Sequence, residues 1–180
     1  WYLAFATTRD TVTPSLPNRT HRVSKFTRRS HYAVVTLTGS LATAVGSVVD
    51  PGDEVLILAP FWPLIRGIVQ SWGGCPVEVP FYDRVTDGQT AAEAVRALAS
   101  KRTVALYVST PSNPTGRVLS AEILAALAEL AESEDWWLLS DEVYRDFVYE
   151  GEHVSMAPLA PTRTPITRAG EKTQPTLEGP

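Results

Sequence analysis

The sequence is short of the residues that build disulfide frameworks and metal sites. Its 180 residues include one cysteine, Cys75, and three histidines, which have no acid or thiol partner at metal-ligand spacing. A single cysteine excludes an internal disulfide and any multi-cysteine zinc site. We therefore expect no bound metal, and we interpret Cys75 as a small buried residue.

Long apolar runs are missing as well. No stretch approaches the ~18 consecutive apolar residues of a membrane-spanning helix. The first residues, WYLAFATTRD, lack the basic start of a signal peptide. Hydrophobic residues make up 44%, charged residues 20%, and the formal net charge is −4, which is typical of a soluble globular chain of about one domain. We expect a cytoplasmic protein with no membrane partner.

Charge is unevenly distributed along the chain. Residues 1–32 carry six basic side chains and one acid, whereas residues 33–161 carry seven basic and seventeen acidic ones. A basic arm on an acidic body can indicate nucleic-acid contact. The arm has no helical or strand period, however, so we interpret it as a poorly ordered leader and expect no nucleic-acid partner. Residues 162–180 are also aperiodic, and we expect them to be disordered.

The core over residues 33–161 alternates strand-like runs with helical periods. The predicted strands span 33–38, 54–59, 76–80, 103–109 and 136–140, and the predicted helices span 41–49, 64–72, 91–98 and 121–133. Because the strands are almost continuously apolar, helices should cover both faces of the sheet. The sequence thus predicts an α/β fold with a three-layer, doubly wound, mostly parallel sheet.

Chemically useful side chains follow the predicted strands. They are Gly39, Ser40, Trp62, Asn113, Asp141 and Tyr144. Ligands of doubly wound sheets bind beyond the carboxyl ends of the strands. Taken singly, Gly39 suits a turn and Trp62 suits core packing. Asn113 suits an Asn-Pro turn, and Asp141 suits a helix cap. Together they supply a phosphate cradle, a stacking ring, an amide, a carboxylate and a phenol. Pyridoxal 5′-phosphate is a flat, aromatic and phosphorylated ligand that fits this set.

Four strings of the core resemble the large domain of class I/II aminotransferases, the fold-type I pyridoxal-phosphate enzymes. They are DPGDEV at 50–55, APFW at 59–62, SNPTG at 112–116 and SDEVY at 140–144. The most specific feature is SNPTG followed, after one helix and one strand, by DEVY. The resemblance extends from about residue 34 to residue 161, which implies an incomplete large domain.

The resemblance implies a function and roles for the strand-end residues. Members move an amino group between an amino acid and a 2-oxo acid with pyridoxal 5′-phosphate, as homodimers. By this resemblance Asp141 pairs with the ring nitrogen of the cofactor, Asn113 and Tyr144 bind its 3′-oxygen, and Trp62 stacks on its ring. Gly39 and Ser40 correspond to part of the phosphate loop, although the helix after them is about two residues shorter than in the family.

The lysine that holds the cofactor covalently is the weakest part of the resemblance. It normally follows the aspartate by roughly thirty residues. Lys172 lies 31 residues after Asp141 (172 − 141) and is the candidate catalytic residue. The serines of the family motif are missing beside it, and Pro165 should interrupt the preceding strand. The family's small domain, with its substrate-binding arginine, is not recognisable either. We therefore expect weak cofactor binding and negligible transamination by the isolated chain.

Other interpretations stay open at this point. β-Lyases, decarboxylases and synthases of the same fold share these cofactor contacts. An inactive product of a frameshifted or truncated gene would explain the aperiodic ends, and re-reading the DNA in neighbouring frames would test this idea. A pyridoxal-phosphate-binding regulatory module is less favoured, because a winged-helix region needs ~60 residues with helical periods.

Overall fold

One six-stranded sheet organises the part of the chain that the structure describes. This computed structural model describes residues 2–5, 37–160 and 165–168. The strands are β1 (Tyr2–Phe5), β2 (Glu54–Ala59), β3 (Cys75–Pro80), β4 (Thr103–Ser109), β5 (Trp137–Asp141) and β6 (Pro165–Arg168). They lie in the order β1-β6-β5-β4-β2-β3, and only the β1–β6 pair is antiparallel. The predicted mostly parallel sheet is confirmed.

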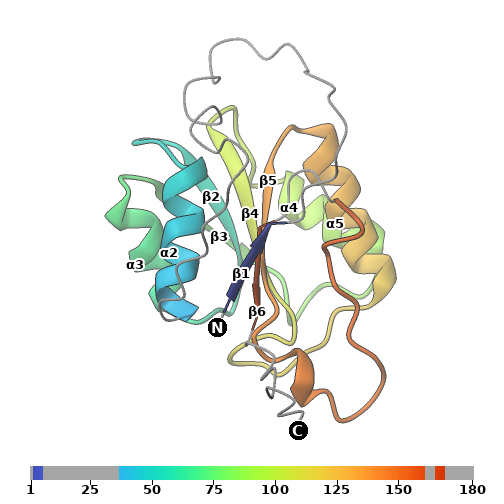
Figure 1. The fold of residues 1–180 in the computed structure, drawn as a ribbon. Helices are drawn as coiled ribbons and strands as arrows, with labels where there is room; N and C mark the ends of the chain where they lie inside the picture. Colours follow the sequence, from blue (N-terminus) through green and yellow to red (C-terminus); the bar gives the residue numbers. More distant parts are fainter. Residues whose placement is uncertain (1, 6–36, 161–164, 169–180) are drawn as a thin grey trace, which may run out of the picture.

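Helices cover both faces of this sheet (Figure 1). Helices α2 (Leu37–Val48) and α3 (Leu64–Ser71) pack on one face, and α4 (Gly88–Arg96) and α5 (Ala121–Ser133) pack on the other. Because side chains alternate along a strand, β2 directs Val55 and Ile57 to the first layer and Leu56 and Leu58 to the second. The three-layer α/β prediction is therefore confirmed. None of the described helices is long and apolar enough to cross a membrane.

Most of the predicted elements lie close to the observed ones. Strands β2 and β4 and helix α5 have the predicted bounds. Helix α5 begins after Ser120, whose hydroxyl accepts a hydrogen bond from the backbone N–H of Ile123 at 3.3 Å. Helix α4 begins at Gly88, earlier than predicted. Asp87 caps it there by accepting from the N–H of Thr90 at 2.8 Å.

The segment before α2 corrects a prediction. Leu37 and Thr38, which were predicted to end a strand over 33–38, begin helix α2, and residues 33–36 lie outside the described part. Gly39 and Ser40 therefore lie within the first turn of α2 instead of in a loop before it. The β-branched run favours a strand locally, but α2 packs its apolar side chains against the sheet, and this packing outweighs local propensity.

Two short strands lie in the end segments, whose sequences show no strand period. β1 lies within residues 1–32 and β6 within residues 162–180. The expected interruption at Pro165 is wrong, because Pro165 is the first residue of β6, a position where strands tolerate proline. β6 runs parallel to β5 and places Thr167 opposite Asp141. Lys172 lies outside the described residues.

Cys75 also differs from its predicted setting. It is exposed, whereas the sequence suggested a buried residue. The reason is its position in the sheet, because it is the first residue of β3 and β3 ends the strand order.

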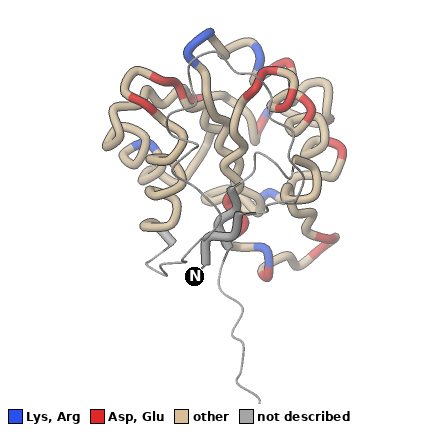
Figure 2. The backbone as a smooth tube through the Cα atoms, turned by 45° about the horizontal axis from the view of Figure 1, so that its top comes forward, with Lys and Arg blue, Asp and Glu red and all other residues tan. Residues whose placement is uncertain are grey.

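Most charged residues of the described part lie on the outer helices and loops (Figure 2). Three described acids are buried, namely Glu54, Asp141 and Glu142. Glu54 begins β2 and accepts a hydrogen bond from Arg102 at 2.5 Å. Asp141 and Glu142 lie at the opposite, carboxyl end of the sheet, where the predicted site is located.

Two glycines of the α3–β3 segment allow a matched test of this packing. A Cβ on Gly74 would lie 2.7 Å from Cγ1 of Val49 and 2.9 Å from Cγ1 of Val69, whereas a Cβ on Gly67 would meet nothing within 4 Å. We predict that Gly74→Ala lowers the free energy of unfolding by about 1–3 kcal/mol through overpacking. Gly67→Ala, inside α3, should raise it by up to about 1 kcal/mol through helix propensity. Urea denaturation measures both, and equal stabilities of the two variants would contradict the packing.

Candidate functional site

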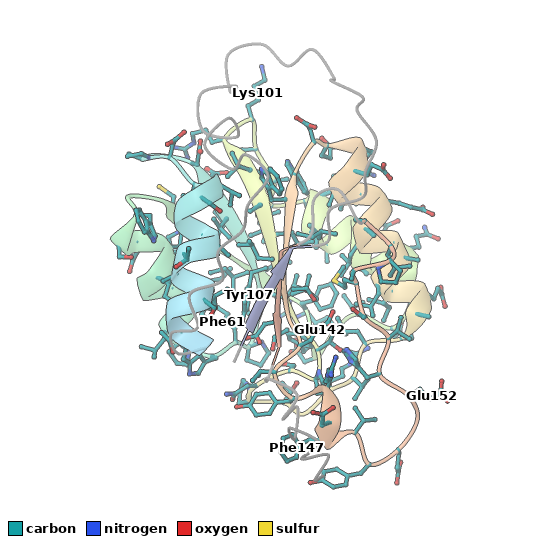
Figure 3. All side chains as sticks on the ribbon, viewed as in Figure 1. Phe61, Lys101, Tyr107, Glu142, Phe147 and Glu152 are labelled. Atoms are coloured by element: carbon teal, nitrogen blue, oxygen red, sulfur yellow. The ribbon has the colours of Figure 1, made fainter. Side chains whose placement is uncertain are left out.

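Three neighbouring strands end at the same level of the sheet. Ile57 pairs with Tyr107, and Tyr107 pairs with Leu139. Each of these strands ends two residues later, at Ala59, Ser109 and Asp141. Trp62, Asn113 and Tyr144 follow these ends in the chain. Figure 3 shows Phe61, Tyr107 and Glu142 toward this end of the sheet, and Lys101 at the opposite end.

Asp141 is a buried acid held by two donors. It is 5% exposed. Its Oδ2 accepts a hydrogen bond from the Tyr107 hydroxyl at 2.7 Å, and its Oδ1 accepts one from the backbone N–H of Val143 at 3.3 Å. Burial raises the pKa of the Asp141 carboxyl above its ordinary value, while the two donors act in the opposite direction because they stabilise the charged form. Asp141 is thus a buried carboxyl group with one donor at each oxygen.

Asn113 and Tyr144 meet although they come from different turns. The side-chain amide of Asn113 donates to the Tyr144 hydroxyl oxygen at 3.2 Å. Asn113 is half-buried, and Tyr144 is 38% exposed. An amide and a phenol therefore stand together at the carboxyl end of the sheet, where a ligand can reach them.

The turn that carries Asn113 is tied to the end of β5 by the backbone. The N–H of Thr110 donates to the carbonyl of Asp141 at 3.1 Å. Further along, the N–H of Gly116 donates to the carbonyl of Ser112 at 2.7 Å. Gly116 has a φ of 70°, in the left-handed region that favours glycine. The Asn-Pro-Thr-Gly string thus closes a turn that is held at the end of β5.

Three further predicted residues, Trp62, Gly39 and Ser40, lie on the side of the sheet that α2 and α3 cover. Trp62 is half-buried and packs against the apolar cluster beneath these helices. Helix α2 ends at Val48, just before the turn into β2, so its first turn, with Gly39 and Ser40, lies at the carboxyl end of the sheet (Figure 1). Ser40 is buried. The course of the chain places these three residues at the carboxyl end of the sheet.

Glu142 is a site residue that the sequence analysis missed. It is fully buried, and its Oε1 accepts hydrogen bonds from the Ser155 hydroxyl at 2.8 Å and the backbone N–H of Met156 at 3.0 Å. Nε2 of His153 lies 3.4 Å from its Oε2. Glu142 therefore fastens the 153–156 segment to the end of β5. The sequence did contain a signal for this residue, namely a second acid directly after a buried strand.

Tyr107 was missed as well. It lies in an otherwise apolar strand, TVALYVS, and only 1% of it is exposed. The signal in the sequence was a phenol two residues before the end of a buried strand. Its hydrogen bond to Asp141 depends on the register of β4 against β5, which the sequence analysis did not predict.

Comparison with known proteins places this chain in a family. The family model for aminotransferase class I and II matches residues 9–175. The aspartate/prephenate aminotransferase of Thermus thermophilus is 43% identical over 136 residues, which cover 73% of this chain and 34% of that protein. The arginine–pyruvate transaminase of Pseudomonas aeruginosa is 38% identical over 130 residues, which cover 70% of this chain and 33% of that protein. The chain thus spans about a third of the length of these relatives.

A solved structure agrees with these sequence matches. The aspartate aminotransferase from Thermus thermophilus with maleate superimposes with a TM-score of 0.67 and 41% identity. The superposition covers 72% of this chain and 34% of that chain.

We predict that Asp141→Asn stabilises the ligand-free chain at neutral pH. Because the folded-state pKa of Asp141 is raised, folding stability is fully present below the unfolded-state pKa and is lost as the pH rises through the folded-state pKa. The gain from asparagine should therefore be absent at acid pH and grow toward neutral pH.

Urea denaturation between about pH 3 and pH 8 measures this gain. Asp146→Asn, at an exposed acid, is the control and should leave the pH dependence unchanged. A gain of the same size at every pH would contradict the prediction.

Proposed function

The chain belongs to the family of class I and II aminotransferases, and from this premise we propose that it supplies the cofactor-binding core of a pyridoxal-phosphate-dependent aminotransferase. The enzyme would move an amino group between an amino acid and a 2-oxo acid. The observation that carries the proposal is the hydrogen bond between Asn113 and Tyr144 at the end of the parallel sheet where β5 ends in the buried Asp141. The relatives' names specify different amino acids, so the proposal is limited to the reaction class.

The side chains at this end of the sheet fit pyridoxal 5′-phosphate. A buried carboxylate suits a protonated ring nitrogen, and the amide and phenol suit an oxygen substituent on the ring. Trp62 offers an aromatic face. The first turn of α2, with Gly39 and Ser40, suits a phosphate because helix N-termini attract anions. When bound, this cofactor supplies an electron-withdrawing ring that stabilises negative charge at the substrate Cα.

Each of the site residues has a distinct role in the proposed enzyme. Asp141 keeps a proton on the ring nitrogen, because a buried anion favours a neighbouring cation. Asn113 and Tyr144 hold the 3′-oxygen in one orientation. Lys172 would hold the cofactor covalently until the amino group of the substrate displaces it, and the amine freed in this way would then move the proton at Cα as a general base and acid.

We propose a homodimer for the enzyme. Aromatic side chains beside the site support this proposal, since Phe147 is 60% exposed and Tyr149 is 92% exposed. Phe147 makes an edge-to-face contact with Tyr144, with ring centroids 6.4 Å apart. Exposed aromatic groups next to a binding site are typical of surfaces that a partner covers.

We predict weak, saturable binding of pyridoxal 5′-phosphate to the 180-residue chain. Asp141→Asn should weaken it about 10-fold to 100-fold, because it removes a charge-assisted hydrogen bond worth about 1.5–3 kcal/mol. Asp146→Asn, at an exposed acid of the 3₁₀ turn Arg145–Phe147, should leave it unchanged. Absorbance titration gives the affinities, and equal affinities of the wild type and Asp141→Asn would refute the role of Asp141.

We predict that borohydride reduction of the cofactor-loaded chain labels Lys172. Peptide mapping by mass spectrometry identifies the labelled lysine. Lys101 is the internal control, because it lies at the opposite end of the sheet (Figure 3). Labelling that persists unchanged in Lys172→Ala would exclude Lys172 as the cofactor lysine.

A further inference from the structure

The buried hydroxyl of Tyr107 makes a hydrogen bond that the packing of its ring does not require. The ring of Tyr107 lies in the apolar cluster with Ile57 and Leu139, where an aliphatic side chain would also pack. Its hydroxyl reaches beyond this cluster and donates to Oδ2 of Asp141 at 2.7 Å. Figure 3 shows Tyr107 near the centre of the molecule.

The sheet register explains why a tyrosine can make this contact. Tyr107 pairs with Leu139, two residues before Asp141, and side chains two residues apart share a face of the sheet. The tyrosine side chain is long enough to reach Asp141, two residues farther along the neighbouring strand. Phenylalanine at this position would fill the same space and leave Oδ2 without this donor.

The hydroxyl remains a donor across the physiological pH range. Burial raises the pKa of Tyr107 well above its ordinary value, and the negative charge of Asp141 raises it further. Two other titratable groups act on this region. Glu142 follows Asp141 in the chain, and Tyr82 lies after β3 and donates its hydroxyl to the carbonyl of Ser109 at 2.5 Å.

We propose that Tyr107 is a positioning residue for Asp141, and this inference rests on the function proposed above. Its hydroxyl fixes one carboxylate oxygen, so that the buried group keeps one orientation and its charge. Among the described residues, Oδ1 receives the longer bond from Val143, at 3.3 Å, which leaves lone pairs for a further donor. The ligand class is a heteroaromatic ring whose nitrogen carries a proton.

The first test needs no cofactor. In a chain labelled with ¹³C at the aspartate carboxyls, NMR titration follows Asp141, whose signal is assigned by its loss in Asp141→Asn. Tyr107→Phe should raise the pKa of the Asp141 carboxyl, because the donor that stabilises the charged form is lost. Tyr82→Phe is the matched control, since it removes a buried hydroxyl that bonds to a carbonyl, and it should cause a much smaller change.

The second test uses pyridoxal 5′-phosphate and its 1-deaza analogue, in which carbon replaces the ring nitrogen. Tyr107→Phe should weaken binding of pyridoxal 5′-phosphate about 10-fold. It should leave the affinity for the analogue unchanged. In the Asp141→Asn background the same substitution should have no further effect, because the two residues act as a unit.

The outcomes separate this inference from the proposed function. An unchanged pKa of Asp141 in Tyr107→Phe would overturn the inference, and so would an equal loss of affinity for both ligands. A raised pKa in a chain that binds neither ligand would refute the proposed function and, with it, the cofactor role of Tyr107.

A second replacement covers the case in which Tyr107→Phe does not fold. Site-specific replacement of Tyr107 by 3-fluorotyrosine keeps the ring and gives a stronger donor. It should lower the pKa of the Asp141 carboxyl, and an unchanged pKa would again overturn the inference.

Discussion

A carboxyl group buried at the end of β5 sets requirements that the surrounding structure meets. Burying an acid is costly unless donors surround it, and Asp141 has the Tyr107 hydroxyl and the backbone N–H of Val143. Its carbonyl also accepts from Thr110, which ties the Asn113 turn to the same strand. The carboxyl group, the amide and the phenol of Tyr144 are thus parts of one connected arrangement. A ligand with a protonated ring nitrogen would offset the remaining free-energy cost of burying the charge.

The doubly wound sheet makes this arrangement accessible as well as rigid. Parallel strands end together, so residues far apart in sequence reach the same end of the sheet. The helical layers bury the strands on both faces and leave that end as the place for polar chemistry. Glu142 also holds the structure around the site together, because it accepts hydrogen bonds that fasten residues 153–156 to the end of β5. The site is therefore built on strand ends and short turns, whose backbone hydrogen bonds limit their motion.

The sequence predicted what depends on local pattern, and it failed where distant contacts decide. Apolar runs and a cap residue predicted β2, β4 and α5 with their observed bounds. The β-branched run before Gly39 suggested a strand through Thr38, but packing of α2 on the sheet makes a helix there. The bond between Tyr107 and Asp141 could not be predicted, because it exists only in one register of two strands.

The central claim is that Asp141 keeps a proton on the ring nitrogen of a bound pyridoxal 5′-phosphate. The most direct measurement is the ¹⁵N NMR chemical shift of cofactor labelled at that nitrogen, bound to the chain at neutral pH. The account predicts the shift of a protonated pyridinium in the wild type and that of a neutral pyridine in Asp141→Asn. The same neutral-pyridine shift in both proteins would contradict it.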